Sequence, residues 1–425
     1  MYKQYLIKDF TPDLRVLMLD FNSYFASVEQ QLNPSLRGAP VGVVPMKAET
    51  TSCIAASYEA KLHGVKTGTR VSEARKLCPH IRFVVAKHAK YVKMHQQAVE
   101  IVNRFIPVAA VLSIDEMCAT LTPRWQTEAA ATQLALDIKA ALLAELGECM
   151  RTSIGFGSNR FLAKTASNLQ KPNGLVLLRA HQLPQALYHL DLESLTGIGK
   201  NMGARLRSYG ITSVEALYQQ NRTQLRTVWG GIGGELFWDQ LHGHEKHRVE
   251  TATQSIGHSH VMPPHERNRM SACGVLDRLT QKAAMRLRKS AYVCTHMAVR
   301  VRFIDVPSQP STWENSAHCS ETDDTHTLLT MLHTLLNTWS GTRHTAKPLK
   351  VGLVLSGFVP RAQVTGDLFE SSHSAHEQQC LNVALDTLNT RFGKNTVYYA
   401  TAQNALDSAP MRIAFNRIPD LATES

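Results

Sequence analysis

The chain has 425 residues, of which 44% are hydrophobic and 19% charged, and this length is enough for about two to four domains with sizeable cores. Its charged first segment and the lack of a long uncharged apolar run predict a cytoplasmic protein with no membrane partner. Basic residues outnumber acidic ones by 46 to 35, a net charge of +11, which favours a polyanionic partner such as nucleic acid.

The first part of the chain alternates between strand and helix patterns. A short apolar run over 15–20 ends on Asp20, and the next segment has helical spacing at Phe25, Val28 and Leu32. The elements predicted after it are strands in "APVGVV" and "TTSCIAASYEA", a short helix in "VSEARKLCP" capped by Ser72, a helix over 92–106, a strand over 108–121, a helix over 126–146, a strand containing Ile154, a helix capped by Ser158 that ends near 169, and a turn at "KPNG". This mixture predicts an α+β fold layered around one sheet.

The second part of the chain changes character. Residues 173–245 are mostly helical with glycine punctuation, and 246–254 are polar enough for a linker. A separate unit over 255–360 is predicted in the order strand, helix (267–290), strand (293–303), strand (312–319), helix (323–340), strand (348–358). A tail over 361–425 follows.

Three carboxylates stand at or near the ends of predicted strands. Asp115 and Glu116 follow the apolar run of "VLSIDEMCAT", and Asp20 ends the first strand. Carboxylates that converge at one sheet edge repel one another unless cations neutralise them, and hard oxygen ligands select Mg²⁺ over zinc. Two such ions would support phosphoryl transfer. The alternative for each acid alone is a helix cap or a solvated side chain.

Three further side chains are candidates for binding phosphate. Tyr58 and Lys61 stand three residues apart in "ASYEAKLHGVKTG", where one helical turn would direct both at the same anion. Lys164 lies in "GFGSNRFLAKTASNLQKPNG", whose G-x-G lacks the spacing of a phosphate-binding P-loop. Its helix would begin directly after a strand and carry the ammonium toward the same sheet edge. The alternative for both lysines is a solvated surface position.

Two segments are candidates for binding a nucleic-acid backbone. "LTGIGKNMGARL" predicts a helix, a tight turn at Gly197 and Gly199, and a second helix starting near Lys200, so that backbone N–H groups face a phosphate. "MAVRVRF" alternates an apolar face with Arg300 and Arg302, and that basic face would be open to DNA. An ordinary helical corner and a merely solvated face are the alternatives.

Neither metal-binding nor disulfide patterns appear among the eight cysteines. They show no C-x-x-C spacing, so neither a disulfide framework nor a zinc site is supported. The basic helical stripe that begins at Arg278 is predicted to be solvated.

Five motifs, in this order, resemble those of the Y-family translesion DNA polymerases. They are "LDFNSYFASVE", "YEAKLHGVKTG", "SIDE", "SIGFGSNRFLAKTASNLQKPNG" and "LTGIGK", and the resemblance covers nearly the whole chain. It implies an α+β multidomain fold like a right hand, with a mixed-sheet palm, small fingers, a helical thumb and a βαββαβ little-finger domain. The implied boundaries are 1–23 and 87–172 for the palm, 24–86 for the fingers, 173–245 for the thumb, 246–254 for a linker, 255–360 for the little finger and 361–425 for the tail.

The resemblance also implies roles for the candidate residues. Asp20, Asp115 and Glu116, with the main-chain carbonyl of Phe21, would hold two Mg²⁺ ions. The implied triphosphate contacts are Tyr58, Lys61 and Lys164, and Phe25 falls where the family keeps an aromatic steric gate against a 2′-OH. The implied partners are primer-template DNA and dNTPs.

The tail suggests further partners. "AQVTGDLFES" and "LDTLNTRFGKNTVYYA" resemble the catalytic subunit of bacterial polymerase V, as does Lys61, so accessory subunits are possible partners, whereas Tyr58 and the palm helix resemble polymerase IV. "QVTGDLF" resembles a sliding-clamp peptide with Gln363, Leu368 and Phe369, although a glycine stands where leucine is usual. Local packing of the Leu-Phe pair is the alternative.

The function implied is template-directed DNA synthesis past damage, in DNA repair and the SOS response. The alternative is a polymerase-like accessory protein that binds DNA without robust catalysis. A two-metal nuclease would leave Phe25 and Tyr58 unexplained.

Overall fold

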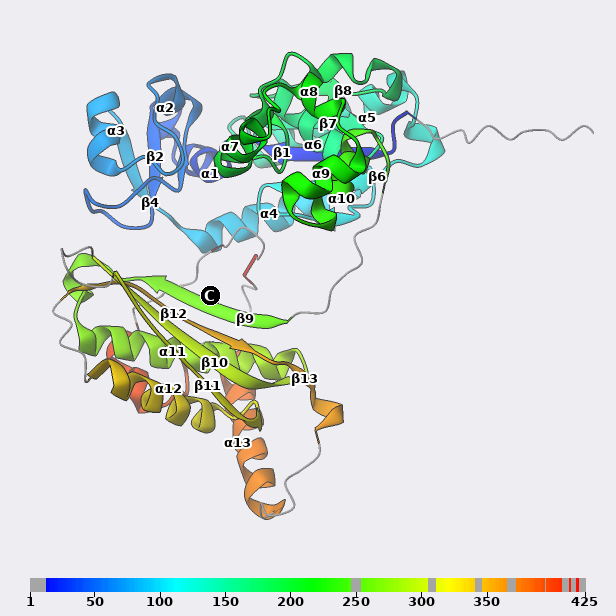
Figure 1. The fold of residues 1–425 in the computed structure, drawn as a ribbon. Helices are drawn as coiled ribbons and strands as arrows, with labels where there is room; N and C mark the ends of the chain where they lie inside the picture. Colours follow the sequence, from blue (N-terminus) through cyan, green and yellow to red (C-terminus); the bar gives the residue numbers. More distant parts are fainter. Residues whose placement is uncertain are drawn as a thin grey trace, which may run out of the picture. The chain divides into compact units, whose positions relative to one another are not determined.

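A computed structural model describes residues 13–245, 254–304, 311–340, 346–364, 372–393, 395–406, 413 and 418–419. The chain forms two compact units: 1–248 with 413–418, and 249–412 with 419–425 (Figure 1). No helix in these described ranges is both long and apolar enough to cross a membrane.

A five-stranded mixed sheet forms the centre of the first unit. Its order is β5 (Ala110–Val111), β6 (Glu116–Thr120), β1 (Val16–Phe21), β7 (Thr152–Gly157) and β8 (Leu175–Leu177). β1 runs antiparallel to both neighbours, and β7 runs parallel to β8. β1 and β7 are buried along their whole length. In β1, apolar residues occupy both faces, as expected of a strand that is covered on both sides.

Three helices accompany this sheet: α4 (His88–Asn103), α5 (Glu128–Leu146) and α6 (Arg160–Leu169). α6 lies very close to β7, because an added Cβ on Gly155 would meet the Ala163 carbonyl oxygen at 2.2 Å and one on Gly157 the Ala163 nitrogen at 2.7 Å. The G-x-G of this segment therefore serves helix packing. The N-cap of α6 is Asn159, whose side chain accepts from Leu162 N at 2.8 Å, so the prediction of Ser158 as the cap is wrong.

The predicted strand over 108–121 is in fact a hairpin. β5 and β6 are joined by a turn, in which the N–H of Leu112 donates to the carbonyl of Glu116 at 2.9 Å. Asp115 lies in the turn and Glu116 begins β6. A hairpin satisfies the backbone within the apolar run, while the two charged side chains stay at its end.

A smaller sheet, in the order β3 (Ala55–Ala56), β2 (Val41–Val44), β4 (Arg82–Val85), packs with α1 (Tyr24–Leu32), α2 (Tyr58–Leu62) and α3 (Val71–Leu77). Most of "TTSCIAASYEA" is not a strand, because Ser57 caps α2 by accepting from Ala60 N at 3.3 Å. The N-cap of α3 is Arg70, so Ser72 does not have its predicted role.

The rest of the first unit is mostly helical, and its core includes Phe161, Leu162 and Ala166 of α6. It comprises α7 (Lys200–Ser208), α8 (Val214–Tyr218), α9 (Arg222–Trp229) and α10 (Ile232–Leu241). The predicted helix before Gly197 is only a 3₁₀ turn, Leu192–Ser194. Gly197 has φ +91°, a conformation that favours glycine in the tight turn before α7.

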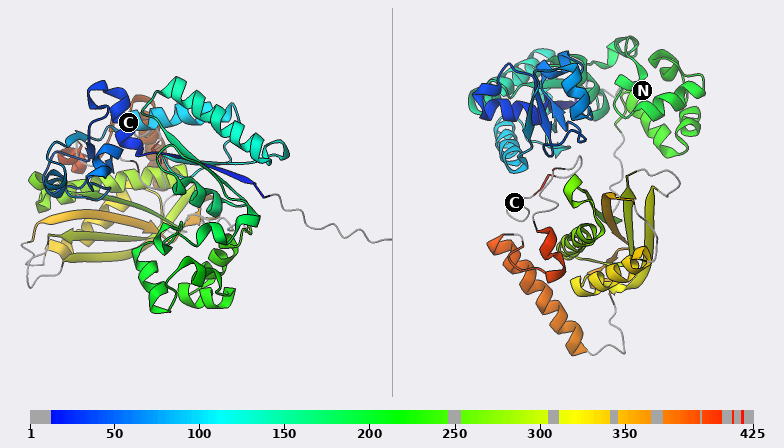
Figure 2. Two further views of the ribbon diagram at one scale, coloured as in Figure 1. Left: turned by 90° about the horizontal axis from the view of Figure 1, so that it is seen from above. Right: turned by 90° about the vertical axis from the view of Figure 1, so that its left-hand side faces the viewer.

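The second unit has the predicted βαββαβ order. Its elements are β9 (Ser255–Val261), α11 (Arg269–Lys289), β10 (Tyr292–Phe303), β11 (Thr312–Thr322), α12 (Thr325–Ser340), β12 (Pro348–Ser356) and the short β13 (Val359–Pro360), in a sheet ordered β11-β10-β12-β9. α11 and α12 share one core with Val299, Val301 and Phe303 of β10, so both helices cover the same face of the sheet (Figure 2).

Part of the tail packs against these helices. α13 (Ser372–Phe392) is attached where Arg288 Nε contacts Asp386 Oδ2 at 2.7 Å. Arg278 is only 3% exposed and donates to the carbonyl of Ala405 at 2.6 Å. The prediction that Arg278 is solvated is therefore wrong, because residues from the tail cover this side of α11.

Candidate active site

The carboxylates of Asp20 and Glu116 face each other across two paired strands. The two residues are register partners in the β1–β6 ladder, so their side chains lie on one face of the sheet. Strand alternation places Asp20 on the same face as Val16 and Met18, which pack with Ala163 of α6. Asp20 is only 4% exposed. Asp115 is held next to them because the N–H of Phe21 donates to its carbonyl at 2.8 Å.

Two lysines neutralise this acidic edge. Lys164, one residue after Ala163 in α6, forms ion pairs with both Asp20 and Glu116, the latter at 2.6 Å. Lys171 Nζ lies 2.7 Å from the other carboxylate oxygen of Asp20. The approach of Lys164 to this sheet edge agrees with the prediction from its helix. The sequence gives no sign of the Lys171 contact, because "KPNG" predicts only a turn.

The pKa values express the same crowding of charge. Burial raises the pKa of Glu116, the charge of Lys164 lowers it in part, and the charges of Asp20 and Asp115 raise it further. Burial alone would lower the pKa of Lys164, but the charges of Asp20 and Glu116 outweigh burial and raise it. The carboxylate oxygens of Asp20 and Glu116 thus converge on the ammonium group of Lys164, and carboxylate oxygens are also the ligands that Mg²⁺ takes.

Phe25 lies beside this edge at the start of α1. Its ring stacks on Tyr91 at 4.6 Å between centroids and meets His88 edge-on at 6.1 Å. The chain reaches α1 through Ser23, which has left-handed φ 52° and a buried hydroxyl without a hydrogen-bond partner in the described part of the chain. Such strain with an unpaired polar group is frequent at functional sites.

Tyr58 and Lys61 lie together on α2, as their spacing predicted. Lys61 Nζ is 4.3 Å from the centroid of the Tyr58 ring. Burial, and then the negative charge of Asp20, raise the pKa of Tyr58. Burial, and then the positive charge of Lys171, lower the pKa of Lys61. The charge of Asp20 thus acts on both of these α2 side chains.

Two buried side chains that the sequence analysis missed hold the acidic edge from behind. His95 Nδ1–H donates to the carbonyl of Ile114 at 2.9 Å, directly before Asp115. Asn22 accepts from the N–H of Asn173 at 2.7 Å and so fixes the turn that carries Lys171. The sequence signal for His95 is a histidine on the otherwise apolar face of α4. Asn22 lies in the motif "LDFNSYFASVE", but the motif gives no sign of its contact with Asn173.

The other candidates belong to other elements of the chain. Lys200 begins α7 and Gly199 is its N-cap. Arg300 and Arg302 are exposed on the sheet face opposite Val299 and Val301. Arg300 is paired with Glu314 at 2.7 Å. Gln363 ends an exposed 3₁₀ turn, while Leu368 and Phe369 lie outside the described residues.

Comparisons with known proteins agree with this architecture. Residues 19–168 match the model of the impB/mucB/samB family, and 253–368 match the model of its C-terminal domain. The chain is 30% identical over 398 residues to a DNA polymerase IV of Moorella thermoacetica, covering 92% of this chain and 96% of that protein. It is 28% identical over 415 residues to a DNA polymerase IV of Bacillus velezensis, covering 95% and 96%.

A solved structure shares the fold. A Y-family DNA polymerase chimera of Dbh and Dpo4 superposes with a TM-score of 0.66 at 23% identity, covering 81% of this chain and 99% of that one. The α+β multidomain fold implied by the five motifs is thereby confirmed. With its motifs, its paired acids and these relatives, the chain belongs to the Y family of translesion DNA polymerases.

Proposed function

We propose that this protein is a template-directed DNA polymerase that adds dNTPs to a primer 3′-OH by two-metal phosphoryl transfer. The observation that carries the proposal is the convergence of Asp20 and Glu116 on one cationic group, Lys164 Nζ, with Asp115 next in the chain. Family membership and relatives named DNA polymerase IV support it.

The residues at the sheet edge fit a pair of Mg²⁺ ions. Asp20, Asp115 and Glu116 offer hard carboxylate oxygens, and Phe21, the last residue of β1, offers its main-chain carbonyl. Bound ions would activate the 3′-OH and neutralise charge on the triphosphate. Lys164 and Lys171 would then be released from the acids and could pair with phosphate oxygens instead.

The neighbouring side chains fit an incoming nucleotide. Tyr58 and Lys61 would contact the triphosphate from α2, together with Lys164. Phe25 would stand against the sugar and exclude a 2′-OH. Desolvation lowers the pKa of Lys61. A bound phosphate anion would raise this pKa again, because an opposite charge nearby favours the protonated ammonium.

We further propose the palm, fingers, thumb, linker, little-finger and tail boundaries given above as functional divisions. In the thumb, Gly197, Gly199 and Lys200 would present the N-terminus of α7 to a DNA phosphate. In the little finger, the exposed face of β10 would contact the sugar-phosphate backbone of the DNA. A cytoplasmic location and roles in damage tolerance and the SOS response accord with this activity and its DNA substrate.

The deciding experiment is extension of a labelled primer on a DNA template with Mg²⁺ and dNTPs. Template-dependent extension is the expected result, and chelation of the metal should stop it. If the protein binds primer-template DNA without extending it, the alternative of an accessory protein without robust catalysis gains support. Adding accessory subunits of the polymerase V type would separate that alternative from a partner-dependent polymerase.

The exposed arginines of β10 lead to a graded prediction. Arg302→Ala should weaken DNA binding at every sequence tested and reduce the slope of log K against log salt by about 1, because one phosphate contact is lost. Arg300→Ala is the matched control and should have a smaller effect, since Glu314 already neutralises Arg300. Equal slopes in the parent and the Arg302 variant would contradict this assignment.

The clamp segment can be tested with paired substitutions. Leu368→Ala with Phe369→Ala should abolish capture by a sliding clamp while primer extension without the clamp stays unchanged, because the two apolar anchors are lost and the active site is not altered. Leu381→Ala with Phe392→Ala, two exposed apolar residues of α13, is the control and should be captured as the parent is. Capture of the Leu368/Phe369 variant at the level of the parent would contradict the proposal.

A further inference from the structure

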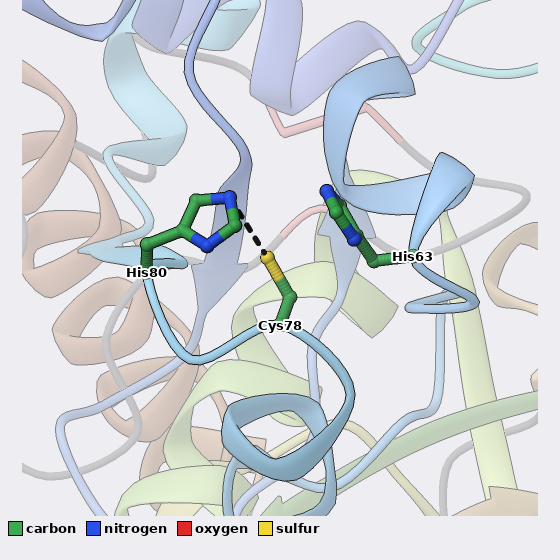
Figure 3. Close-up of side chains that lie close together, drawn as sticks. All are labelled: His63, Cys78 and His80. Atoms are coloured by element: carbon green, nitrogen blue, oxygen red, sulfur yellow. Dashed lines mark hydrogen bonds between the residues drawn. The ribbon is translucent and has the colours of Figure 1, made fainter.

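Three metal-ligating side chains converge in the small three-stranded sheet region, apart from the carboxylates. They are His63, Cys78 and His80, whose ligand atoms all lie within 4.8 Å of one another. The two imidazole rings stand on either side of the Cys78 sulfur (Figure 3), with their centroids 5.2 Å apart and their planes at 89°. Cys78 is buried, and both histidines are exposed, so the sulfur lies under an accessible pair of nitrogen ligands.

The local fold fixes the positions of all three residues. His63 is the C-cap of α2 and precedes Gly64, which has φ +86° and turns the chain. Cys78 is the C-cap of α3 and is part of the apolar core of this region. His80 follows after a single proline, whose fixed φ restricts the connection. Two helix ends and one short link therefore present the ligands from a packed core.

The distances suit a zinc ion. Cys78 Sγ lies 3.8 Å from His80 Nε2. With Zn–S near 2.3 Å and Zn–N near 2.05 Å, a tetrahedral site separates sulfur and nitrogen by about 3.6 Å. Within the described ranges, the His80 ring has no hydrogen-bond partner besides Cys78, and the His63 ring has none. One thiolate and two imidazoles form a borderline-soft donor set, which selects Zn²⁺ over Mg²⁺.

We propose that His63, Cys78 and His80 bind one Zn²⁺ ion, with a water molecule as the fourth ligand. Binding requires the thiolate, so the Cys78 thiol proton is released to solvent as the Zn–S bond forms. The ion would join the end of α2 to the end of α3. Because α2 carries Tyr58 and Lys61, the site would hold in place the helix that presents these two candidate phosphate contacts.

Cobalt is the suitable probe, because Co²⁺ replaces Zn²⁺ at such sites and its thiolate complex absorbs light. Full-length protein is freed of metal, kept reduced with a phosphine, and titrated with Co²⁺ in excess Mg²⁺, which occupies oxygen sites. The parent should develop thiolate-to-cobalt charge-transfer absorption that saturates at one ion per chain and disappears on addition of Zn²⁺. Cys78→Ser should lose this absorption, whereas Cys380→Ser, which changes an exposed cysteine, should keep it.

The two exposed histidines provide variants that should fold normally. His63→Asn and His80→Asn should each weaken Zn²⁺ binding, measured by competition with a chromophoric chelator, by more than the roughly 10- to 100-fold that loss of an outer-shell partner costs. His189→Asn, another exposed histidine, is the control and should bind as the parent does. Circular dichroism checks that each variant is folded.

Two results would overturn the proposal. One is a parent without thiolate-to-cobalt absorption, which would leave a Cys–His hydrogen bond beneath a pair of packed rings. The other is unchanged binding in folded Cys78→Ser or in both histidine variants. None of these measurements uses polymerase activity, so the zinc proposal and the polymerase proposal can fail independently.

Discussion

Asp115→Ala combined with Glu116→Ala should reduce primer extension on the order of 10³-fold or more. The double change removes two of the three carboxylates that would hold the metal ions, and metal ions supply several kcal/mol of transition-state stabilisation, at about 1.4 kcal/mol for each factor of ten in rate. The measurement is single-turnover extension of a labelled primer in saturating Mg²⁺ and dNTPs.

The double variant should remain folded. Lys164 keeps Asp20 as its partner, so no buried lysine loses all its counter-charge. Glu73→Ala with Glu100→Ala, which changes two exposed acids outside this edge, is the matched control and should extend primers at the parental rate. Retained binding of primer-template DNA by the inactive variant would assign the loss to chemistry. Extension at the parental rate by the Asp115/Glu116 variant would refute the two-metal assignment.

Phe25→Ala should increase incorporation of ribonucleotides relative to deoxyribonucleotides by roughly 10- to 200-fold, the range in which one added or missing group changes selectivity in a pocket. The ring is packed in place by Tyr91 and His88, so it cannot easily move aside for a 2′-OH. Its removal would open space at the proposed position of the sugar and would leave the carboxylates unchanged. The measurement is the ratio of kcat/KM for a dNTP and its matching rNTP.

Phe25→Tyr keeps the ring and is the control for this change. Phe25→Tyr should retain the parental discrimination between dNTPs and rNTPs. The discrimination by Phe25→Leu should lie between that of Phe25→Tyr and that of Phe25→Ala. Because each ratio compares two substrates on the same protein, a loss of stability in a variant cancels. The same dNTP preference in Phe25→Ala and the parent would show that the ring has only a packing role.

The zinc proposal illustrates what sequence spacing cannot show. Cys78 and His80 are two residues apart, but His63 is remote in sequence and meets them only because the ends of α2 and α3 come together. C-x-x-C spacing therefore cannot reveal such a site. That Tyr58 and Lys61 are neighbours could be predicted from the sequence, since both lie on a single helical turn and need no tertiary contact to meet.

Features that depend on local order along the chain could be predicted from the amino-acid sequence. Apolar periodicity located most of the strands and helices, including the βαββαβ unit, and the motifs identified the family. The alternation in β10 correctly assigned Val299 and Val301 to the core and Arg300 and Arg302 to the surface, because strand geometry fixes which side chains share a face.

Features that depend on pairing between distant segments could not be predicted, because they arise when the chain folds. The β1–β6 register sets Asp20 opposite Glu116, and the close approach of α6 brings Lys164 to both acids. Three further contacts also join segments that are apart in the sequence: Lys171 with Asp20, Glu314 with Arg300, and the tail with Arg278. Charges interact through distance and burial, and neither quantity is fixed until the sheet, its helices and the tail have packed.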